Sequence, residues 1–374
     1  YEEYRFLDSN TYLYPAKDFL FYQADIRSKE LVKQRMEGIQ AVLSGEPVTV
    51  VTSLDGFMDH LAPKESIAEK VLKIQNDSVL KLDEMAEKLS VIGYDREVQV
   101  EGPGQFAVRG GILDIYPLTE ELPVRIELWG DEVDSIRTFD VESQRSIENL
   151  MDIVIYPAVE FPQNGEKGVS FLDYFPPEDT ILFLDEPVRL VERGQNIEDE
   201  FMEAQKKRLE SGYDLEEEEA KIFPVTEILK KINCYSSIGF YALGMKCKGL
   251  EVRESYEIQA KSVNPYNNSF EMLTQDLKRL KRNGYRVILL SGSRTRAKRL
   301  AEDLRDYNLS SYYSEDLDRE VKPGEIMTAY GYIAEGYEYP MLKFTVIAES
   351  DIFGKRKKKK KRNTYEGRKI QCFS

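Results

Sequence analysis

Between Glu101 and Ile147 the sequence shows short apolar-polar alternations separated by tight turns, and this stretch constrains the fold more than any other. The turn signals in it are Gly102-Pro103-Gly104, Gly110-Gly111, Glu120–Pro123 and Gly130-Asp131. Residues of these types favour chain reversal, and reversals at such short intervals predict a meander of antiparallel strands. Because the flanking sequence instead alternates helical periodicity with continuous apolar runs, we place an inserted α+β domain at residues 73–157.

On either side of the meander, helical periodicity alternates with continuous apolar runs. Residues 26–44 carry apolar side chains at helical spacing, and the β-branched run PVTVVTS follows them. Beyond the meander, DTILFLDEP (179–187) is typical of a buried strand that ends in two carboxylates. Helices that alternate with fully apolar strands favour a parallel sheet covered on both faces. We therefore expect one parallel-sheet α/β domain, split into residues 1–72 and 158–263.

A third unit is expected at residues 264–353. An amphipathic helix over 269–285 ends at a glycine, and strand and helix patterns then alternate through RVILLSG, SRTRAKRLAEDLRDYNL, EIMTAY and LKFTVIAESDIF. This alternation predicts a small α/β domain. Residues 354–374 are basic and poor in apolar residues, so we interpret them as a linker. The predicted fold class is therefore multidomain α/β, with a parallel-sheet domain, an inserted antiparallel α+β domain and a small third domain.

Charge is distributed unevenly along the chain. The net charge of −15 combines +9 in residues 355–374 with −24 in the rest. An acidic body disfavours non-specific binding to nucleic acid, which depends on cationic contacts. The basic run of the linker consists of Lys355, Arg356, Lys357, Lys358, Lys359, Lys360, Lys361 and Arg362. We interpret it as a solvated tether, and contact with nucleic acid or a polymerase is the alternative.

Motifs for catalysis are sparse. The sequence contains no GxxxxGK[ST] phosphate loop, without which Asp185 and Glu186 have no nucleotide to act on. His60 is the only histidine, and the three cysteines form no CxxC pair, so we expect neither a zinc site nor a catalytic triad. The sequence contains no run of 18 apolar residues, the length that a membrane-spanning helix requires, so we predict no membrane span. We predict no catalytic residue, no metal and no cofactor in this chain, and the scattered cysteines suit a reducing cytoplasm.

Strand alternation singles out three side chains of the meander. In QFAVR (105–109) and VRIELW (124–129) the apolar residues share one face, which leaves Arg109, Arg125 and Trp129 on the other. If the two strands pair, these three side chains would form one surface cluster. Arginine and tryptophan are enriched at interface hot spots, so the cluster predicts a partner-binding surface. The alternative is that Trp129 closes a second small core, with arginine stems packed over it.

The segment GQFAVRGGILDIYP…LPVRIELWGDEVDSIRTFDVESQRSI resembles the second domain shared by the excision-repair helicase UvrB and the bacterial transcription-repair coupling factors. The segment from YPAKDF to VVTS resembles the first domain of the same module, and ESDIFGKRKKKKKRNTYEG resembles the exit from the coupling factors' third domain. Two features favour the coupling factors over UvrB. YEEYRF runs into YLYPAKDF without a tyrosine-rich hairpin insertion, and a third domain with a basic linker follows instead of a second motor lobe.

This resemblance implies a degenerate P-loop, RecA-like fold for the first domain, which would make Asp185 and Glu186 an inactive relic. It implies that the chain starts inside a longer bacterial cytoplasmic protein, an ATP-dependent DNA translocase whose ATP and Mg²⁺ sites lie in motor domains outside this sequence. In the family, the second domain docks onto the damage-recognition ATPase UvrA. The family's contact residues correspond to Arg109, Arg125 and Trp129, with tryptophan at a position where phenylalanine is more usual.

The function expected from the resemblance is that of a non-catalytic adaptor, which recruits UvrA to stalled RNA polymerase during transcription-coupled nucleotide excision repair. RNA polymerase would be bound through the next domain, DNA through the motor, and the protein's own C-terminal domain would mask the second domain. One alternative is a UvrB-type helicase fragment that handles damaged DNA directly. The other is a structural spacer whose surface arginines and tryptophan have no partner.

Overall fold

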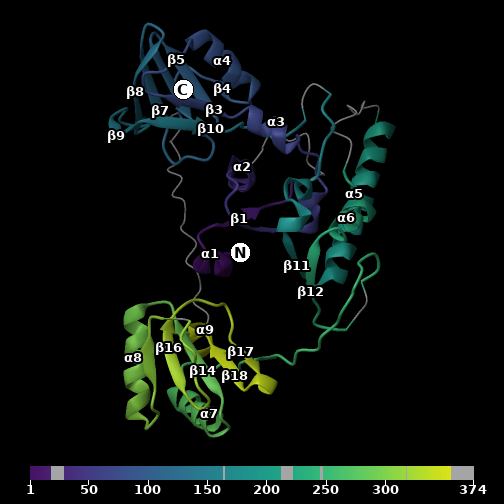
Figure 1. The fold of residues 1–374 in the computed structure, drawn as a ribbon, viewed down its shortest axis with the longest axis vertical. Helices are drawn as coiled ribbons and strands as arrows, with labels where there is room; N and C mark the ends of the chain where they lie inside the picture. Colours follow the sequence, from purple (N-terminus) through teal and green to yellow (C-terminus); the bar gives the residue numbers. More distant parts are fainter. Residues whose placement is uncertain (18–28, 163–164, 212–221, 245–246, 317, 355–374) are drawn as a thin grey trace, which may run out of the picture. The chain divides into compact units, whose positions relative to one another are not determined.

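The computed structural model describes residues 1–17, 29–162, 165–211, 222–244, 247–316 and 318–354 (Figure 1). The basic run from Lys355 to Arg362 therefore lies outside the described residues. The chain divides into two compact units, one of residues 3–253 and one that begins at residue 254, and each is considered by itself. None of the described helices has the length and apolarity that crossing a membrane requires.

In the first unit, the segments on either side of the meander form two parallel strand pairs. Strand β1 (Thr11–Tyr14) pairs with β2 (Thr49–Thr52), and helix α2 (Lys29–Leu43) connects them. Strand β11 (Ile181–Asp185) pairs with β12 (Ser236–Phe240). The other helices here are α1 (Glu2–Leu7), η1 (Leu54–Phe57), α3 (Lys64–Glu69), η2 (Phe171–Tyr174), η3 (Pro177–Asp179), α5 (Pro187–Glu210) and α6 (Val225–Ile232). A mixed α/β fold is confirmed, but among the described residues the parallel strands of these two flanking segments form two separate pairs.

The prediction of a buried strand at residues 179–187 is wrong for one of its faces. Leu182 and Leu184 pack against a hydrophobic core, whereas Ile181 and Phe183 are exposed. The apolar run is continuous, but β11 has one strand neighbour and one covered face among the described residues. An apolar run shows that a strand is able to be buried and does not show how many layers cover it.

The stretch between these halves forms a six-stranded sheet in the order β4-β5-β6-β7-β8-β9. Its strands are β4 (Asp95–Arg96), β5 (Gln105–Arg109), β6 (Ile112–Tyr116), β7 (Val124–Trp129), β8 (Glu132–Phe139) and β9 (Ser146–Leu150). From β5 to β9 every pair is antiparallel, which confirms the predicted meander. The chain enters along β3 (Leu72–Gln75) and leaves along β10 (Asp152–Ile155), and these two strands pair antiparallel.

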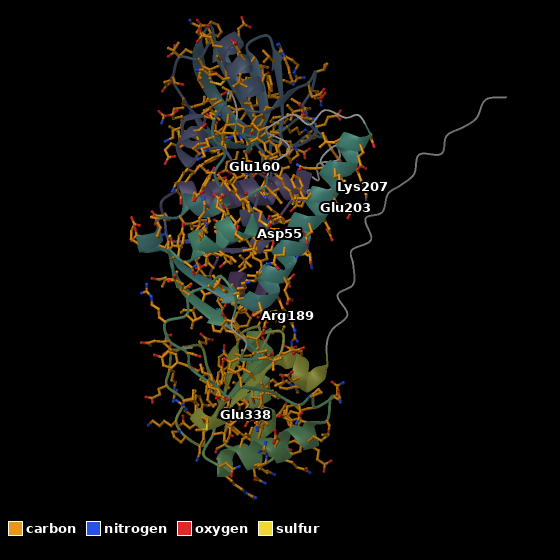
Figure 2. The ribbon with its side chains drawn as sticks, turned by 90° about the vertical axis from the view of Figure 1, so that its right-hand side faces the viewer. Asp55, Glu160, Arg189, Glu203, Lys207 and Glu338 are labelled. Atoms are coloured by element: carbon orange, nitrogen blue, oxygen red, sulfur yellow. The ribbon has the colours of Figure 1, made fainter. Side chains whose placement is uncertain are left out.

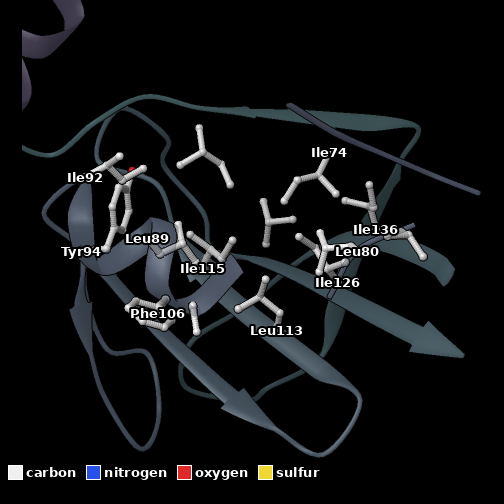
Figure 3. Close-up of a cluster of buried hydrophobic side chains, with 14 residues drawn as sticks. Ile74, Leu80, Leu89, Ile92, Tyr94, Phe106, Leu113, Ile115, Ile126 and Ile136 are labelled. Atoms are coloured by element: carbon white, nitrogen blue, oxygen red, sulfur yellow. The ribbon is translucent and has the colours of Figure 1, made fainter. Parts of the chain in front are cut away.

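One face of this sheet is the core of the inserted domain. Helix α4 (Leu82–Val91) contributes Leu89, and the strands contribute Phe106, Leu113, Ile126 and Ile136, all of them buried (Figure 3). A bulge adjusts the pattern between β7 and β8, where Glu127 pairs with Ser135 but Leu128 pairs with Val133. The extra residue, Asp134, lets Val133 and Ile136 both face the core despite their spacing of three.

The second unit contains a six-stranded mixed sheet in the order β13-β17-β18-β14-β16-β15. The strands are β13 (Lys261–Ser262), β14 (Arg286–Ser291), β15 (Tyr312–Ser314), β16 (Ile326–Tyr330), β17 (Tyr337–Tyr339) and β18 (Phe344–Ile347). The helices are α7 (Phe270–Arg282), α8 (Arg294–Asp306), η4 (Pro340–Leu342) and α9 (Glu349–Phe353). Leucines of α7 and α8 pack with Val287 and Leu289 of β14 in one core, which confirms a mixed α/β fold for this unit.

A buried ionic cluster joins the two halves of the split domain. Arg35 of α2 has a fully buried side chain, and its Nε lies 2.8 Å from Oε1 of Glu160, the carboxylate just beyond the insertion. Glu160 is labelled in Figure 2. Its Nη2 lies 2.8 Å from Oδ2 of Asp59. Lys17 Nζ approaches the same two carboxylates, at 2.6 Å from Glu160 and 2.9 Å from Asp59. The Arg35 guanidinium also lies 4.3 Å from the ring centroid of Tyr14.

The cluster sets the protonation of Glu160. Burial by itself would raise the pKa of the Glu160 carboxyl, but the charges of Arg35 and Lys17 outweigh burial and lower it to about 2. The carboxylate is therefore charged in the folded chain at any pH near neutrality. A charge buried in this way is tolerated only when its partners are present.

Arg35→Ala should lower the free energy of unfolding by about 3–5 kcal/mol, because it leaves two buried carboxylates without their main partner. Urea denaturation at pH 7 measures this change. Lys33→Ala is the matched control on the same helix, since the ion pair that Lys33 forms among the described residues is a long i,i+4 contact of 3.8 Å with Glu37. The control should cost no more than about 0.5 kcal/mol. Equal effects of the two variants would contradict the role assigned to the cluster.

Acid should remove the contribution of Glu160. Its pKa is about 2 in the folded chain, below the ordinary value of 4.5, so the folded state binds fewer protons than the unfolded state between these values. The stabilisation is fully present above pH 4.5 and is lost as the pH falls toward 2. Unfolding free energies of the wild type and Glu160→Gln, measured from pH 6 to pH 3, should converge as the pH falls. A constant difference over that range would contradict this prediction.

Candidate functional site

The face of the inserted sheet opposite the core carries a cross-strand row that includes three charged side chains. Ala107 on β5, Asp114 on β6, Arg125 on β7 and Arg137 on β8 are direct cross-strand partners. Their neighbours along each strand, such as Phe106 and Ile126, point to the core. The row therefore lies on the outer face, where the sequence pattern placed Arg109, Arg125 and Trp129.

Strands β5 and β7, which carry Arg109 and Arg125, do not pair with each other, although the predicted surface cluster assumed that they would. Strand β6 lies between β5 and β7 in the sheet. The Gly110-Gly111 turn makes β6 the hairpin partner of β5, and β7 then adds to the free edge of β6. Arg109 and Arg125 are nevertheless brought together, because a side chain on β6 bridges the gap.

That side chain is Asp114, whose carboxylate is 1% exposed. Its Oδ2 accepts a hydrogen bond from Arg109 Nη2 at 2.6 Å and another from Arg125 Nη2 at 2.9 Å. Its Oδ1 accepts from Arg125 Nε at 2.7 Å, so Arg125 binds the carboxylate through two nitrogens. This fork-to-carboxylate arrangement is the strong, geometrically specific form of an arginine ion pair. One acid thus fixes arginines from both flanking strands.

Arg125 is held from three sides. Besides Asp114, its Nη2 donates to Gln144 Oε1 at 2.8 Å, and its guanidinium lies 4.4 Å from the ring centroid of Phe139. The hydrogen bonds to Asp114 raise the pKa of Arg125, so its charge is permanent. Its side chain is 14% exposed, whereas that of Arg109 is 43% exposed. Arg125 therefore forms the floor of the cluster, and Arg109 presents more of its guanidinium to a partner.

Trp129 does not close a second core, because it is 84% exposed. The aromatic residue that arginine covers on this face is Phe139, which is buried beneath Arg125. Nearby, Arg137 forms an ion pair with Glu127, and Ser135 Oγ donates to the same carboxylate. The face thus combines two internally paired ionic groups with one large aromatic side chain that the chain itself leaves uncovered.

Asp185 and Glu186 lie elsewhere, at the end of β11. Glu186 adopts a left-handed backbone conformation with φ of 50°, and its Oε1 accepts a hydrogen bond from the Ala242 amide at 2.7 Å. This contact anchors the loop after β12 to the exit from β11. Among the described residues, no group of three or more His, Cys, Asp or Glu side chains has a metal-binding arrangement.

Asp114 is the residue of this site that the sequence reasoning missed. A signal was present, because in GILDIY an acid stands at the centre of an otherwise apolar strand. Ile112, Asp114 and Tyr116 share the outer face by alternation, and the two-glycine turn sets Asp114 against Ala107, next to Arg109. Counting register across this hairpin would have predicted a carboxylate beside the arginine.

This face lies within a segment that matches a known family. Residues 72–161 match the family model of the UvrB interaction domain. The match covers the whole inserted sheet and includes Arg109, Asp114, Arg125 and Trp129. The remaining segments of the chain lie outside it.

Over nearly its whole length the chain is similar to transcription-repair-coupling factors. The chain is 27% identical to the transcription-repair-coupling factor of Bacillus subtilis strain 168, in an alignment that covers 95% of this chain and 35% of the relative. It is 24% identical to proteins of the same name from Staphylococcus haemolyticus and Staphylococcus epidermidis, over 95% and 96% of the chain and 35% of each relative. The chain thus spans about a third of the length of the curated relatives it matches.

Asp114→Ala should destabilise the inserted domain, whereas Trp129→Ala should not. Without Asp114, the poorly exposed Arg125 loses its charged partner, a change that typically costs about 1–3 kcal/mol. Trp129 is 84% exposed, so its removal should change the free energy of unfolding by less than about 0.5 kcal/mol. Thermal and urea denaturation of both variants tests this. A large loss of stability in Trp129→Ala would show that its ring packs on the domain.

Proposed function

We propose that this chain acts as a non-catalytic adaptor that recruits UvrA to stalled RNA polymerase in transcription-coupled nucleotide excision repair. The observation that carries the proposal is the outer face of the UvrB interaction domain, where Arg109 and Trp129 are accessible beside a preformed arginine–aspartate cluster. The match of residues 72–161 and the similarity to transcription-repair-coupling factors support it. Arg109, Arg125 and Trp129 are the proposed UvrA contacts.

The hydrogen bonds to Asp114 hold the two arginines in place and leave part of Arg109 accessible to UvrA. Arg109 donates to Asp114 through Nη2 and keeps 43% of its side chain exposed, which leaves guanidinium donors for a carboxylate on UvrA. Trp129 supplies a large rigid area that becomes buried on binding. Arg125 and Asp114 hold the arginine side chains in place before the partner arrives. Binding therefore costs less side-chain entropy than it would with freely rotating arginines.

The rest of the proposal concerns the parts around this domain. Residues 1–72 and 158–263 are proposed to form a degenerate RecA-like domain, which the parallel pairs β1·β2 and β11·β12 support. Asp185 and Glu186 are its inactive relic. ATP and Mg²⁺ act in motor domains outside this chain. Domains outside this chain also make the contacts to DNA and RNA polymerase. The C-terminal domain masks the UvrA-binding face, and the protein works in the bacterial cytoplasm.

Titration calorimetry of the chain with purified UvrA tests the proposal. Trp129→Ala should weaken binding at least tenfold, because truncation of a central anchor typically costs about 2 kcal/mol or more. Arg109→Ala and Arg125→Lys should weaken it as well, the latter because lysine lacks the planar fork that Arg125 uses on Asp114. Circular dichroism establishes that each variant is folded. Arg96→Ala, an exposed arginine on β4, is the control and should bind like the wild type.

Two results would contradict the adaptor. One is the absence of wild-type binding to UvrA, and the other is unchanged affinity in a folded Arg109→Ala/Trp129→Ala double variant. The UvrB-type alternative predicts measurable binding to duplex DNA with a steep dependence on salt. The charge of −24 outside the basic linker predicts weak binding instead. Fluorescence anisotropy with a labelled duplex between 50 and 200 mM salt separates the two.

A further inference from the structure

Trp129 belongs to another row of side chains on this face, beyond Glu127 along β7 from the row of Arg125. Trp129 on β7 pairs directly with Glu132 on β8, across the Gly130-Asp131 turn. On the other side of Glu132, an isolated antiparallel bridge places Val79 opposite it. The amide of Val133 donates to the carbonyl of Ser78, and the amide of Leu80 donates to that of Asp131, which fixes the register of this bridge.

Direct cross-strand partners point to the same side of a sheet, so Val79, Glu132 and Trp129 form one row on the outer face. Val79 is 78% exposed and Trp129 is 84% exposed, and the carboxylate between them is exposed too. Within the part of the chain that the structure describes, no hydrogen bond or ion pair reaches the Glu132 carboxylate. The other acids of this face are paired, Asp114 with two arginines and Glu127 with Arg137.

This row has a consequence for any partner that covers Trp129. A protein that buries the tryptophan ring also removes water from Glu132, since the two side chains are adjacent. A buried carboxylate without a partner is costly, whereas a carboxylate paired with a cation at an interface rim gives orientation and selectivity. The matching surface must therefore place a positive charge at Glu132.

We propose that Val79 and Glu132 complete the UvrA-docking surface, with a lysine or arginine of UvrA opposite Glu132 and apolar side chains of UvrA over Val79 and Trp129. This inference rests on the proposed adaptor function. Together with Arg109 on β5, it makes the surface bipolar, with a cationic end and an anionic end. Arg109 on β5 and Glu132 on β8 are three strand spacings apart, or about 14 Å. A surface with this polarity accepts a partner of opposite polarity in one orientation only.

Calorimetric titration of UvrA with single variants of this chain tests the inference. Glu132→Gln should weaken binding three- to tenfold, and Glu132→Lys should weaken it more than tenfold, because it sets like charges against each other. Val79→Ala should weaken binding about threefold. The loss in Glu132→Gln should shrink between 50 and 500 mM salt, since salt screens a charge pair at an interface rim.

Matched controls come from the β4 edge of the same sheet. Val98 is an exposed valine beside an exposed glutamate, Glu97, and neither lies on the row of Trp129. Val98→Ala and Glu97→Gln should bind UvrA within twofold of the wild type. Because all these side chains are exposed, the variants should keep wild-type unfolding curves.

The outcomes separate this inference from the proposed function. If UvrA binds the wild type and Trp129→Ala weakens binding, the adaptor stands whatever Glu132 does. Unchanged or tighter binding by Glu132→Gln and Glu132→Lys in that setting would overturn the inference alone, because it would show that no cation faces this carboxylate. If the wild type does not bind UvrA, the adaptor and the inference fall together.

Discussion

The buried pair of Arg35 and Glu160 is the interaction on which the arrangement of the first unit depends. Arg35 lies on a helix before the inserted domain, and Glu160 follows that domain by a few residues. With a side chain that is fully buried, Arg35 has no water to satisfy its charge, so Glu160 and Asp59 must lie where they do. The pair thus requires the chain to return to the same place after its excursion, beside the point where β3 and β10 close the insertion.

Asp114 is a second buried carboxylate paired with arginine, but its partners are less enclosed. Glu160 is paired with Arg35, whose side chain is fully buried, and with Lys17, whose side chain is 14% exposed. Asp114 is as deeply buried, but its two arginines reach the surface to different degrees. A carboxylate that anchors partly exposed arginines gives a rigid cationic surface, in which binding does not have to order long side chains first. The Glu160 cluster therefore stabilises the fold, whereas the Asp114 cluster preorganises a binding surface.

The outer face of the inserted sheet departs from what folding alone would favour. Trp129 and Val79 remain exposed next to Glu132, a carboxylate without an ion pair among the described residues. Covering either apolar side chain would stabilise the folded state. Nothing in the core requires these residues, because the opposite face of the sheet is filled by Leu89, Phe106, Ile126 and their neighbours. Local features that folding does not explain occur preferentially at binding sites. This is the physical basis for assigning the face to a partner.

The sequence by itself determined the local features of this protein. Turn residues fixed the meander, and strand alternation put Arg109, Arg125 and Trp129 on the outer face, since side chains alternate with a period of two. Only the tertiary structure decided which strands are neighbours. It placed β6 between the arginine strands, added Asp114 to the site, buried Arg125 over Phe139, and brought Val79 to Glu132. It also left Ile181 and Phe183 exposed on a strand whose sequence predicted burial. Periodicity records the face of each side chain, whereas pairing and layering depend on contacts between residues far apart in the chain.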